Sequence, residues 1–168
     1  MGKKLEETFL SAIEQHQQKL LRICSVYAKD EDDKKDLFQE ALINIWQSME
    51  GFVGKSSMGT WMYRVTLNVC LRLQSKNAKK AERFRNIDSI SIENIPVDEK
   101  DQEAHERLVR LRNCIKKLND ADKAVITLFL EELPYKDISE ITGLSENNVA
   151  VKIKRVKEKL LNCIREKP

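Results

Sequence analysis

Turn-forming residues are scarce in this sequence, which has 5 Gly and 3 Pro among its 168 residues. A chain built from β-strands needs frequent turns, and glycine and proline supply many of them. Their scarcity, together with apolar residues that recur at helical spacing, predicts an all-α fold.

Long apolar runs are absent as well. The longest run, Ala124 to Leu130, contains Thr127 and falls far short of the roughly 20 residues that cross a bilayer. Glu6 and Glu7 occupy the place where the apolar segment of a signal peptide would begin. We therefore expect a cytoplasmic protein without a membrane anchor.

Groups that could bind a metal are few, and none has a partner at ligand spacing. They are Cys24, Cys70, Cys114, Cys163, His16 and His105. We expect the cysteines to be thiols in a reducing compartment. The sequence also lacks a nucleophile with a base and a phosphate-binding glycine loop, so it predicts neither an enzyme nor a cofactor. The net charge of +3 is too small to indicate nucleic-acid binding by itself.

The distribution of charge divides the chain into three parts. Basic residues dominate between Lys76 and Arg85, and acidic residues dominate from Asn86 to about Glu103. The acidic segment is rich in Ser, Asn and Pro and has no helical period, which is typical of a linker. We predict two small helical domains, residues 1–85 and 106–168, joined by a flexible acidic linker over residues 86–105.

The first domain contains a predicted helix that begins at Asp36 and has two distinct faces. Its apolar stripe consists of Leu37, Phe38, Ala41, Leu42, Ile45 and Met49. The opposite face carries Asp36, Gln39, Glu40, Ile43 and Gln47. An exposed isoleucine among acids and amides suggests a protein contact, although a solvated polar face with one stray isoleucine explains the same period.

Residues 49–60 concentrate three of the five glycines and two serines, which predicts a loop, and Thr60 can cap the helix after it. One face of that helix is apolar, and the other carries Arg64, Asn68, Arg72, Ser75, Lys76 and Lys79. Phe52, Trp61 and Tyr63 lie near these cations. Base stacking on an aromatic ring contributes about 1–3 kcal/mol per base, so this segment could bind single-stranded nucleic acid. Core packing explains Trp61 equally well.

The second domain contains the pattern of a helix-turn-helix. Pro134 suits the start of a short helix, Gly143 permits the left-handed turn that ends it, and Ser145 caps the next helix. In that last helix an apolar stripe would pack inward: Val149, Ile153, Val156 and Leu160. The residues left facing outward are Asn147, Asn148, Val151, Lys152, Arg155 and Lys159, with Lys154 on the flank.

Asn can bind adenine and Arg or Lys can bind guanine through paired hydrogen bonds in the major groove. Lysines on the flank suit phosphates instead. An ordinary helical hairpin with a charged surface is the alternative.

Taken together, four segments resemble the extracytoplasmic-function sigma factors of the sigma-70 family. DLFQEALINIWQ, residues 36–47, is similar to the family's helix that docks on the clamp of core RNA polymerase. GTWMYRVTLN, residues 59–68, resembles the segment that binds and opens the promoter −10 element. Residues 118–160 look like the domain that reads the −35 element, and the acidic connector is similar to the family's variable linker.

The resemblance implies a role for three sets of residues. The polymerase-binding set is Asp36, Gln39, Glu40, Ile43 and Gln47. The −10 DNA-binding set is Phe52, Trp61, Tyr63, Arg64, Asn68, Arg72, Lys76 and Lys79. The −35 DNA-binding set is Asn147, Asn148, Val151, Lys152, Lys154, Arg155 and Lys159. Arg72 and Ser75 stand where family members commonly have Asp and Arg, and Ala150 stands where they often have Lys.

The implied function is that of a dissociable initiation factor that directs core RNA polymerase to a promoter and helps to melt its −10 element. The implied partners are core RNA polymerase, promoter DNA and a membrane-bound anti-sigma factor, with no small-molecule substrate. A stand-alone helix-turn-helix regulator remains an alternative. A metal-dependent nuclease that uses the acids from Asp30 to Asp36 is another, but these acids lie in a predicted turn without the geometry of metal ligands.

Overall fold

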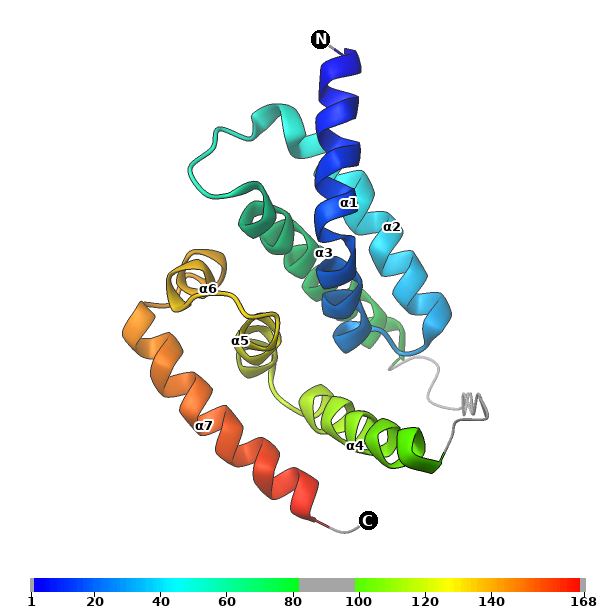
Figure 1. Ribbon diagram of the computed structural model, residues 1–168, viewed down its shortest axis with the longest axis vertical. Coiled ribbons are helices and arrows are strands. Elements are labelled where there is room, and N and C mark those ends of the chain that lie inside the picture. The colour runs from blue at the N-terminus through cyan, green and yellow to red at the C-terminus, as the bar shows by residue number, and fades with distance from the viewer. Residues whose placement is uncertain (1, 82–98, 167–168) are drawn as a thin grey trace.

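The computed structural model describes residues 2–81 and 99–166, and within these the side chains of residues 2–75 and 102–166. The described residues form seven α-helices and one short 3-10 helix, without a strand. The predicted all-α class is therefore confirmed. Figure 1 shows the helices in two units, with α1, α2 and α3 in one and α4 to α7 in the other.

The N-terminal unit consists of α1 (Gly2–Tyr27), α2 (Glu31–Ser48), η1 (Met49–Gly51) and α3 (Met58–Ala81). The helix α2 begins earlier than the sequence predicted. Asp30 caps it by accepting a hydrogen bond from the Asp33 backbone N–H at 2.8 Å. Acidic side chains are favourable in the first turn of a helix because they lie near the positive end of its dipole, so the charged residues 31–35 are helical and not a turn.

The start of α3 also differs from the prediction. Ser57 caps this helix, because its Oγ accepts the Thr60 backbone N–H at 3.1 Å. Thr60, the predicted cap, is buried in the first turn. The sequence could not distinguish Ser57 from Thr60, because both residue types cap helices and the residues between them show no helical pattern that would mark where the helix begins.

The C-terminal unit consists of α4 (Glu99–Lys116), α5 (Asp120–Leu130), α6 (Tyr135–Thr142) and α7 (Glu146–Arg165). The helix α6 ends at Gly143, whose φ of 80° is the left-handed conformation that the sequence predicted. Ser145 caps α7 by accepting the Asn148 backbone N–H at 3.1 Å. Of the predicted linker, residues 86–98 lie outside the described residues, and residues 99–105 are the first turns of α4.

The two units pack against each other, and a single apolar cluster includes residues of both. Leu67 and Cys70 from α3 belong to the same buried cluster as Leu128 from α5, Ile138 from α6 and Val149 from α7. Figure 1 shows α5 and α6 beside the N-terminal unit.

Polar contacts join the units as well. The Arg22 guanidinium donates from Nε to both carboxylate oxygens of Glu131, at 2.8 and 2.9 Å. Lys116 Nζ donates to the Ala28 carbonyl oxygen at 2.8 Å, and Lys123 Nζ lies 5.3 Å from the centre of the Tyr27 ring. The helices α1, α4 and α5 are thus joined by both apolar and charged contacts.

The cysteines differ from the expectation of four thiols. Cys114 of α4 and Cys163 of α7 form a disulfide, whereas Cys24 and Cys70 are buried thiols. The sequence could not indicate this pair, because the two cysteines are 49 residues apart and meet only through the packing of α4 on α7.

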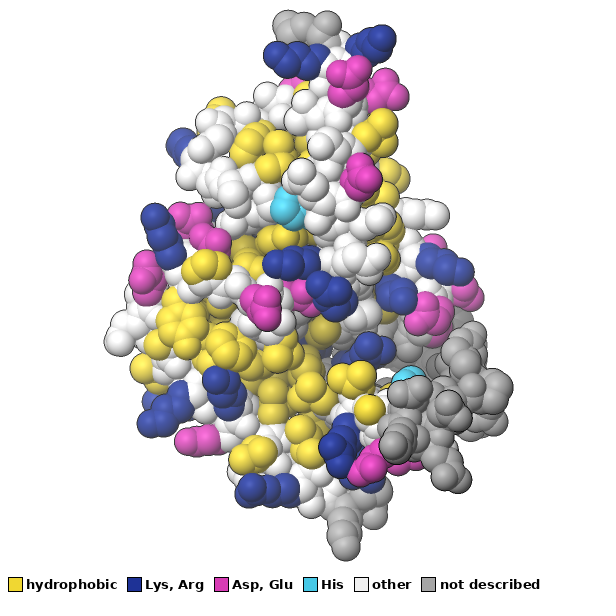
Figure 2. Space-filling model, in the orientation of Figure 1, with side chains coloured by type: hydrophobic (Ala, Val, Ile, Leu, Met, Phe, Trp, Pro, Cys, Tyr) yellow, Lys and Arg dark blue, Asp and Glu magenta, His cyan; other side chains and the backbone are white. Residues whose placement is uncertain are grey.

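Hydrophobic side chains gather on the face shown in Figure 2, over α5 and the helices next to it. Leu108 and Leu130 on this unit are 62% and 48% exposed. They line a groove of about 490 Å³ between α1, α4 and α5, whose polar rim includes Arg22 and Glu131. Among the described helices, none is long and apolar enough to cross a membrane.

Candidate functional site

The outward face of α2 contains all five residues of the predicted polymerase-binding set. Leu37, Ala41 and Ile45 are buried on the opposite face. Asp36, Gln39, Ile43 and Gln47 are exposed, and Glu40 is partly exposed. Ile43 is 49% exposed although it is aliphatic, so the α2 face combines carboxylates and amides with one apolar contact.

Trp46 extends the α2 face, and sequence reasoning had not included it. Its side chain is 40% exposed, and its ring packs edge-on against Phe9 of α1 with the ring centres 5.2 Å apart. The sequence feature that could have identified Trp46 is its position next to the apolar stripe, where a tryptophan can be half-buried and still present one edge of its ring to a partner.

The loop before α3 and the first turns of α3 bring two of the predicted aromatic residues together. The Phe52 and Trp61 ring centres are 5.1 Å apart, and both side chains are partly exposed. Arg64, Asn68 and Arg72 are exposed further along the helix. The side chains of Lys76 and Lys79 lie outside the described residues. An aromatic pair beside a row of polar and basic side chains provides the groups that bind single-stranded bases and phosphates.

Tyr63 is placed differently from the other predicted aromatic residues. Its side chain is buried in the core of the N-terminal unit, with the hydroxyl 2.8 Å from His16 Nδ1. Burial raises the pKa of Tyr63, and nearby Glu131 adds to this rise. Burial, followed by the charge of Lys19, lowers the pKa of His16. In this arrangement Tyr63 fixes α1 against α3 and its ring is not available for base stacking.

The helix-turn-helix reaches the aromatic loop directly. A cavity of about 260 Å³ is lined on one side by Lys55, Trp61 and Arg64 and on the other by Glu140 and Ile141 of α6. The acidic side chain of Glu140 therefore lies on the same cavity as two cations of the N-terminal unit. In this structure, α6 covers part of the surface that the sequence predicted for the −10 strand.

The outer face of α7 matches the prediction for five side chains. Val149, Ile153, Val156 and Leu160 are buried, which places Asn147, Asn148, Val151, Lys154 and Arg155 in exposed positions. Val151 is 40% exposed. Amide, guanidinium and ammonium groups on one side of a capped helix form a surface that can enter a major groove.

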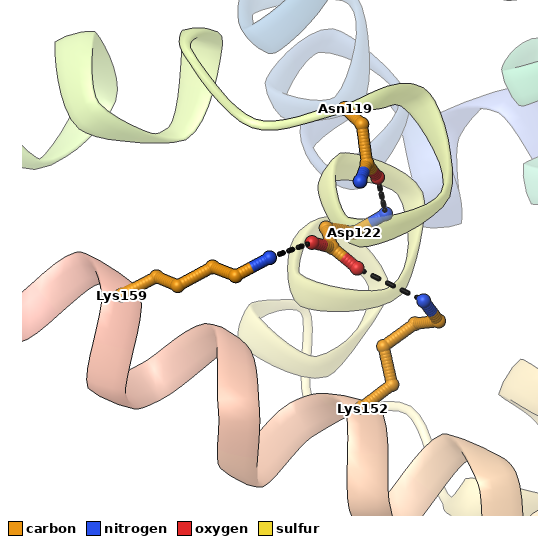
Figure 3. Close-up of polar contacts among 4 residues, drawn as sticks. All are labelled: Asn119, Asp122, Lys152 and Lys159. Carbon is orange, nitrogen blue, oxygen red and sulfur yellow. Dashed lines mark hydrogen bonds and ion pairs between the residues drawn. The ribbon is translucent and has the colours of Figure 1, made fainter.

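Lys152 and Lys159, the other two predicted DNA-binding residues of α7, are held by Asp122 of α5. Their Nζ atoms lie 2.9 Å from Asp122 Oδ1 and Oδ2, respectively (Figure 3). The Asp122 side chain is only 5% exposed, whereas those of Lys152 and Lys159 are 28% and 58% exposed. Burial alone would raise the pKa of Asp122, but the hydrogen bonds from Lys159 and Lys152 outweigh it and lower the pKa.

Asp122 also belongs to the cap of α5. Its backbone N–H donates to Asn119 Oδ1 at 2.8 Å, so one residue joins the start of α5 to two turns of α7 (Figure 3). Sequence reasoning missed this carboxylate. Asn119 is of a residue type that caps helices, but nothing in the sequence could place α7 beside the start of α5.

Comparisons with known proteins agree on one family. Residues 12–80 match the family model described as sigma-70 region 2, and residues 108–160 match the model described as sigma-70, region 4. The RNA polymerase sigma factor SigV of Bacillus subtilis is 26% identical over 147 residues, which cover 87% of this chain and 84% of the relative.

Solved structures share the fold. CnrH, in complex with the cytosolic domain of CnrY, aligns with a TM-score of 0.69 and 20% identity over 94% of this chain and 87% of the other. The sigma factor RpoE of Bartonella quintana, in complex with the anti-sigma factor NepR, aligns with a TM-score of 0.69 and 17% identity over 99% of each chain.

Proposed function

Since the chain belongs to the sigma-70 family of RNA polymerase sigma factors, we propose that it acts as an initiation factor of the extracytoplasmic-function group. It binds core RNA polymerase, directs it to a promoter with −35 and −10 elements, and helps to open the −10 element. The observation that carries this proposal is that one chain presents the α2 face, the aromatic loop before α3 and the exposed face of α7.

The α2 face supplies the polymerase contact in this proposal. Asp36 and Glu40 contribute negative charge that steers and orients the partner. Ile43 contributes apolar area that becomes buried on binding, which is the larger source of free energy. Trp46 joins this set as an aromatic residue at the rim.

The aromatic loop and α3 supply the −10 contact. A base displaced from the duplex stacks on the Phe52 and Trp61 pair, while Arg64 and Arg72 neutralise phosphates and Asn68 offers an amide. Because α6 lines the same cavity as Trp61 and Arg64, a DNA strand can occupy that surface fully only after α6 moves away. The energy for this movement comes from binding to polymerase.

The exposed face of α7 supplies the −35 contact. Asn147, Asn148, Val151 and Arg155 read base edges, and each good bidentate pair discriminates between bases by about 1–3 kcal/mol. Lys154 binds phosphate. Lys152 and Lys159 reach phosphates only by leaving Asp122 or by sharing their N–H donors between Asp122 and a phosphate. They therefore contribute less than the four exposed polar side chains, Asn147, Asn148, Lys154 and Arg155.

Two further properties follow from this function. The chain contributes binding and DNA opening while the polymerase performs the chemistry, so it is not itself an enzyme. It works in the cytoplasm, where polymerase and promoter DNA are found. An anti-sigma factor is its regulatory partner, which is supported by the complexes in which the two structural relatives were solved.

Run-off transcription from a cognate promoter, with core polymerase alone and with core polymerase plus this chain, tests the proposal. We expect accurate transcripts only when the chain is present. The charge-reversed variants Asp36→Lys and Glu40→Lys should weaken binding to core polymerase, whereas Glu14→Lys, an exposed acid on α1, should not. Arg155→Ala should bind core polymerase normally and lose discrimination at the −35 element.

The assay also distinguishes the rival function. A footprint on a palindromic operator by the chain alone, with transcription that does not depend on it, would favour a stand-alone regulator. Competition titration with labelled core polymerase provides the affinities of the variants. Equal affinities for Asp36→Lys and Glu14→Lys would contradict the assignment of the α2 face.

A further inference from the structure

The four cysteines form two pairs in two different environments. Cys114 and Cys163 are joined by a disulfide between α4 and α7. Cys24 of α1 and Cys70 of α3 are fully buried thiols in the other unit. The second pair is close enough to share a hydrogen bond, and this bond together with burial raises the pKa of the Cys70 thiol.

The two pairs differ in how easily they can be oxidised. Thiolates, and not thiols, react with oxidants and disulfides, and they need access to solvent. Cys24 and Cys70 are both 0% exposed, and the pKa of Cys70 is raised, so this pair is protected from oxidants. Cys114 is 6% exposed, but Cys163 is partly exposed in the last turns of α7, so a small reactant approaches this pair from the side of Cys163.

The disulfide closes a loop that contains the whole helix-turn-helix. Cys114 lies near the end of α4 and Cys163 near the end of α7, so α5 and α6 fall between them. Apart from this bond, the ends of α4 and α7 are held by a small apolar cluster in which Ile115, Ile126, Val156 and Leu160 are buried. A cross-link stabilises such a unit mainly by restricting its unfolded state, and a long loop gives a large effect.

We propose that Cys114 and Cys163 form a reversible oxidation site that controls the stability of the helix-turn-helix. The proposal rests on the proposed function in one respect: a protein that works with polymerase is surrounded by reducing thiols, so a solvent-accessible disulfide there opens and closes with the redox state. The oxidised form has α7 fixed on α4 and retains a folded −35 surface under heat stress. The reduced form unfolds this surface more readily.

The chemistry balances with common cellular reactants. In oxidation by hydrogen peroxide, the two thiols lose two electrons and two protons, one S–S bond forms, the O–O bond breaks and two waters are released. With a low-molecular-weight disulfide as oxidant, exchange through a mixed disulfide releases two small thiols instead. A small dithiol reverses either step by reducing the S–S bond.

The experiment uses the purified full chain, treated with hydrogen peroxide or with dithiothreitol. After denaturation, alkylation should label two cysteines of the oxidised protein, Cys24 and Cys70, and four of the reduced protein. The melting temperature should be about 5–10 °C higher in the oxidised form. Both differences should disappear in Cys163→Ser, whereas a Cys24→Ser/Cys70→Ser double variant should retain the difference in melting temperature.

Several outcomes would overturn the proposal. One is four labelled cysteines at every peroxide concentration that leaves the chain folded. Others are a disulfide that dithiothreitol cannot open without denaturant, and a melting temperature that is equal in the two forms. These measurements need no polymerase, so they can fail or succeed independently of the run-off assay that tests the proposed function.

Discussion

The two units of this protein are stabilised in different ways. The N-terminal unit is built from three helices of 26, 18 and 24 residues, packed along a long apolar core. The C-terminal unit includes α5 and α6, of only 11 and 8 residues. Helices this short are marginal alone, so caps, an ion-pair cluster and a disulfide add to the apolar packing of the C-terminal unit.

This difference affects how functional residues are used. In the N-terminal unit, Arg64 and Asn68 are exposed and are separate from the packing that holds α1 to α3. In the C-terminal unit, Lys152 and Lys159 lie on the predicted DNA-binding helix and also hold Asp122. Substitutions at Lys152 and Lys159 are therefore expected to change stability together with the proposed DNA binding, whereas a substitution at Arg64 should change only the proposed DNA contact.

The largest expected effect comes from the cluster that the two units share. Ile153→Ala removes buried methyl groups from α7, where the side chain is 2% exposed, and should cost about 2–5 kcal/mol in free energy of unfolding. Both tryptophans, Trp46 and Trp61, lie in the N-terminal unit, so their fluorescence reports on that unit while circular dichroism reports on all helices.

Because the apolar cluster crosses the boundary, urea unfolding of Ile153→Ala should shift both signals by the same amount. Ile45→Ala, a fully buried residue of α2, is the matched change in the other unit. A tryptophan transition that stays at the wild-type midpoint while the dichroism transition moves would mean that the units unfold independently.

A second prediction concerns the close packing within the N-terminal unit. A Cβ atom at Gly59 would lie 2.7 Å from His16 Cε1, so Gly59→Ala must displace a ring that is hydrogen-bonded to Tyr63. Overpacking costs about 1–3 kcal/mol, and alanine recovers about 1 kcal/mol of helix propensity, so we expect a net loss of up to about 2 kcal/mol.

Gly51→Ala provides the control, because a Cβ atom there meets nothing within 4 Å. Urea denaturation of both variants measures the effect. If the Gly59→Ala cost is due to the ring, it should be smaller in a His16→Ala background than in the wild type. An equal cost in both backgrounds would show that the contact with His16 is not its source.

Local patterns explain which parts of the fold could be predicted from the sequence. The Ser145 cap, the Gly143 turn and the stripe from Val149 to Leu160 depend on residues at most about four turns apart in the chain, and the structure has all three. The exposed α2 face follows from the same helical period. Within one helix, spacing alone determines which side chains share a face.

Long-range packing explains what could not be predicted. Asp122 meets Lys159 across 37 residues and Cys114 meets Cys163 across 49, and no helical period carries that information. Tyr63 is a third example. Its neighbours along α3 suggested an exposed aromatic surface, but the packing of His16 from α1 makes Tyr63 part of the core.

A third prediction separates stability from DNA binding in the C-terminal unit. Asp122→Asn removes the buried charge that holds Lys152 and Lys159, at a cost of about 1 kcal/mol near neutral pH, since both lysines are partly solvated. The pKa of Asp122 is lowered in the folded state, so its stabilising effect is present above its ordinary value of 3.8 and is lost as the pH falls through the lowered pKa.

The difference in unfolding free energy between wild type and Asp122→Asn should therefore disappear in acid, as urea denaturation at a series of pH values would measure. The two released lysines should also raise the affinity for non-specific duplex DNA and steepen its dependence on salt. Asp137→Asn, a partly exposed acid in the first turn of α6, is the control. A difference that persists below the lowered pKa would refute the role of the Asp122 charge.

The smallest expected effect concerns the ion pair that joins the two units. Arg22→Gln removes the guanidinium that binds both oxygens of Glu131, and a double-mutant cycle with Glu131→Gln measures the coupling between them. The Arg22 side chain is 55% exposed, which limits the coupling to about 0.5–1 kcal/mol. The exposed pair Arg107 and Glu103, within α4, provides the control and should give about 0.3–0.5 kcal/mol. A coupling for Arg22 and Glu131 that is below the control value would mean that this ion pair does not help to hold the units together.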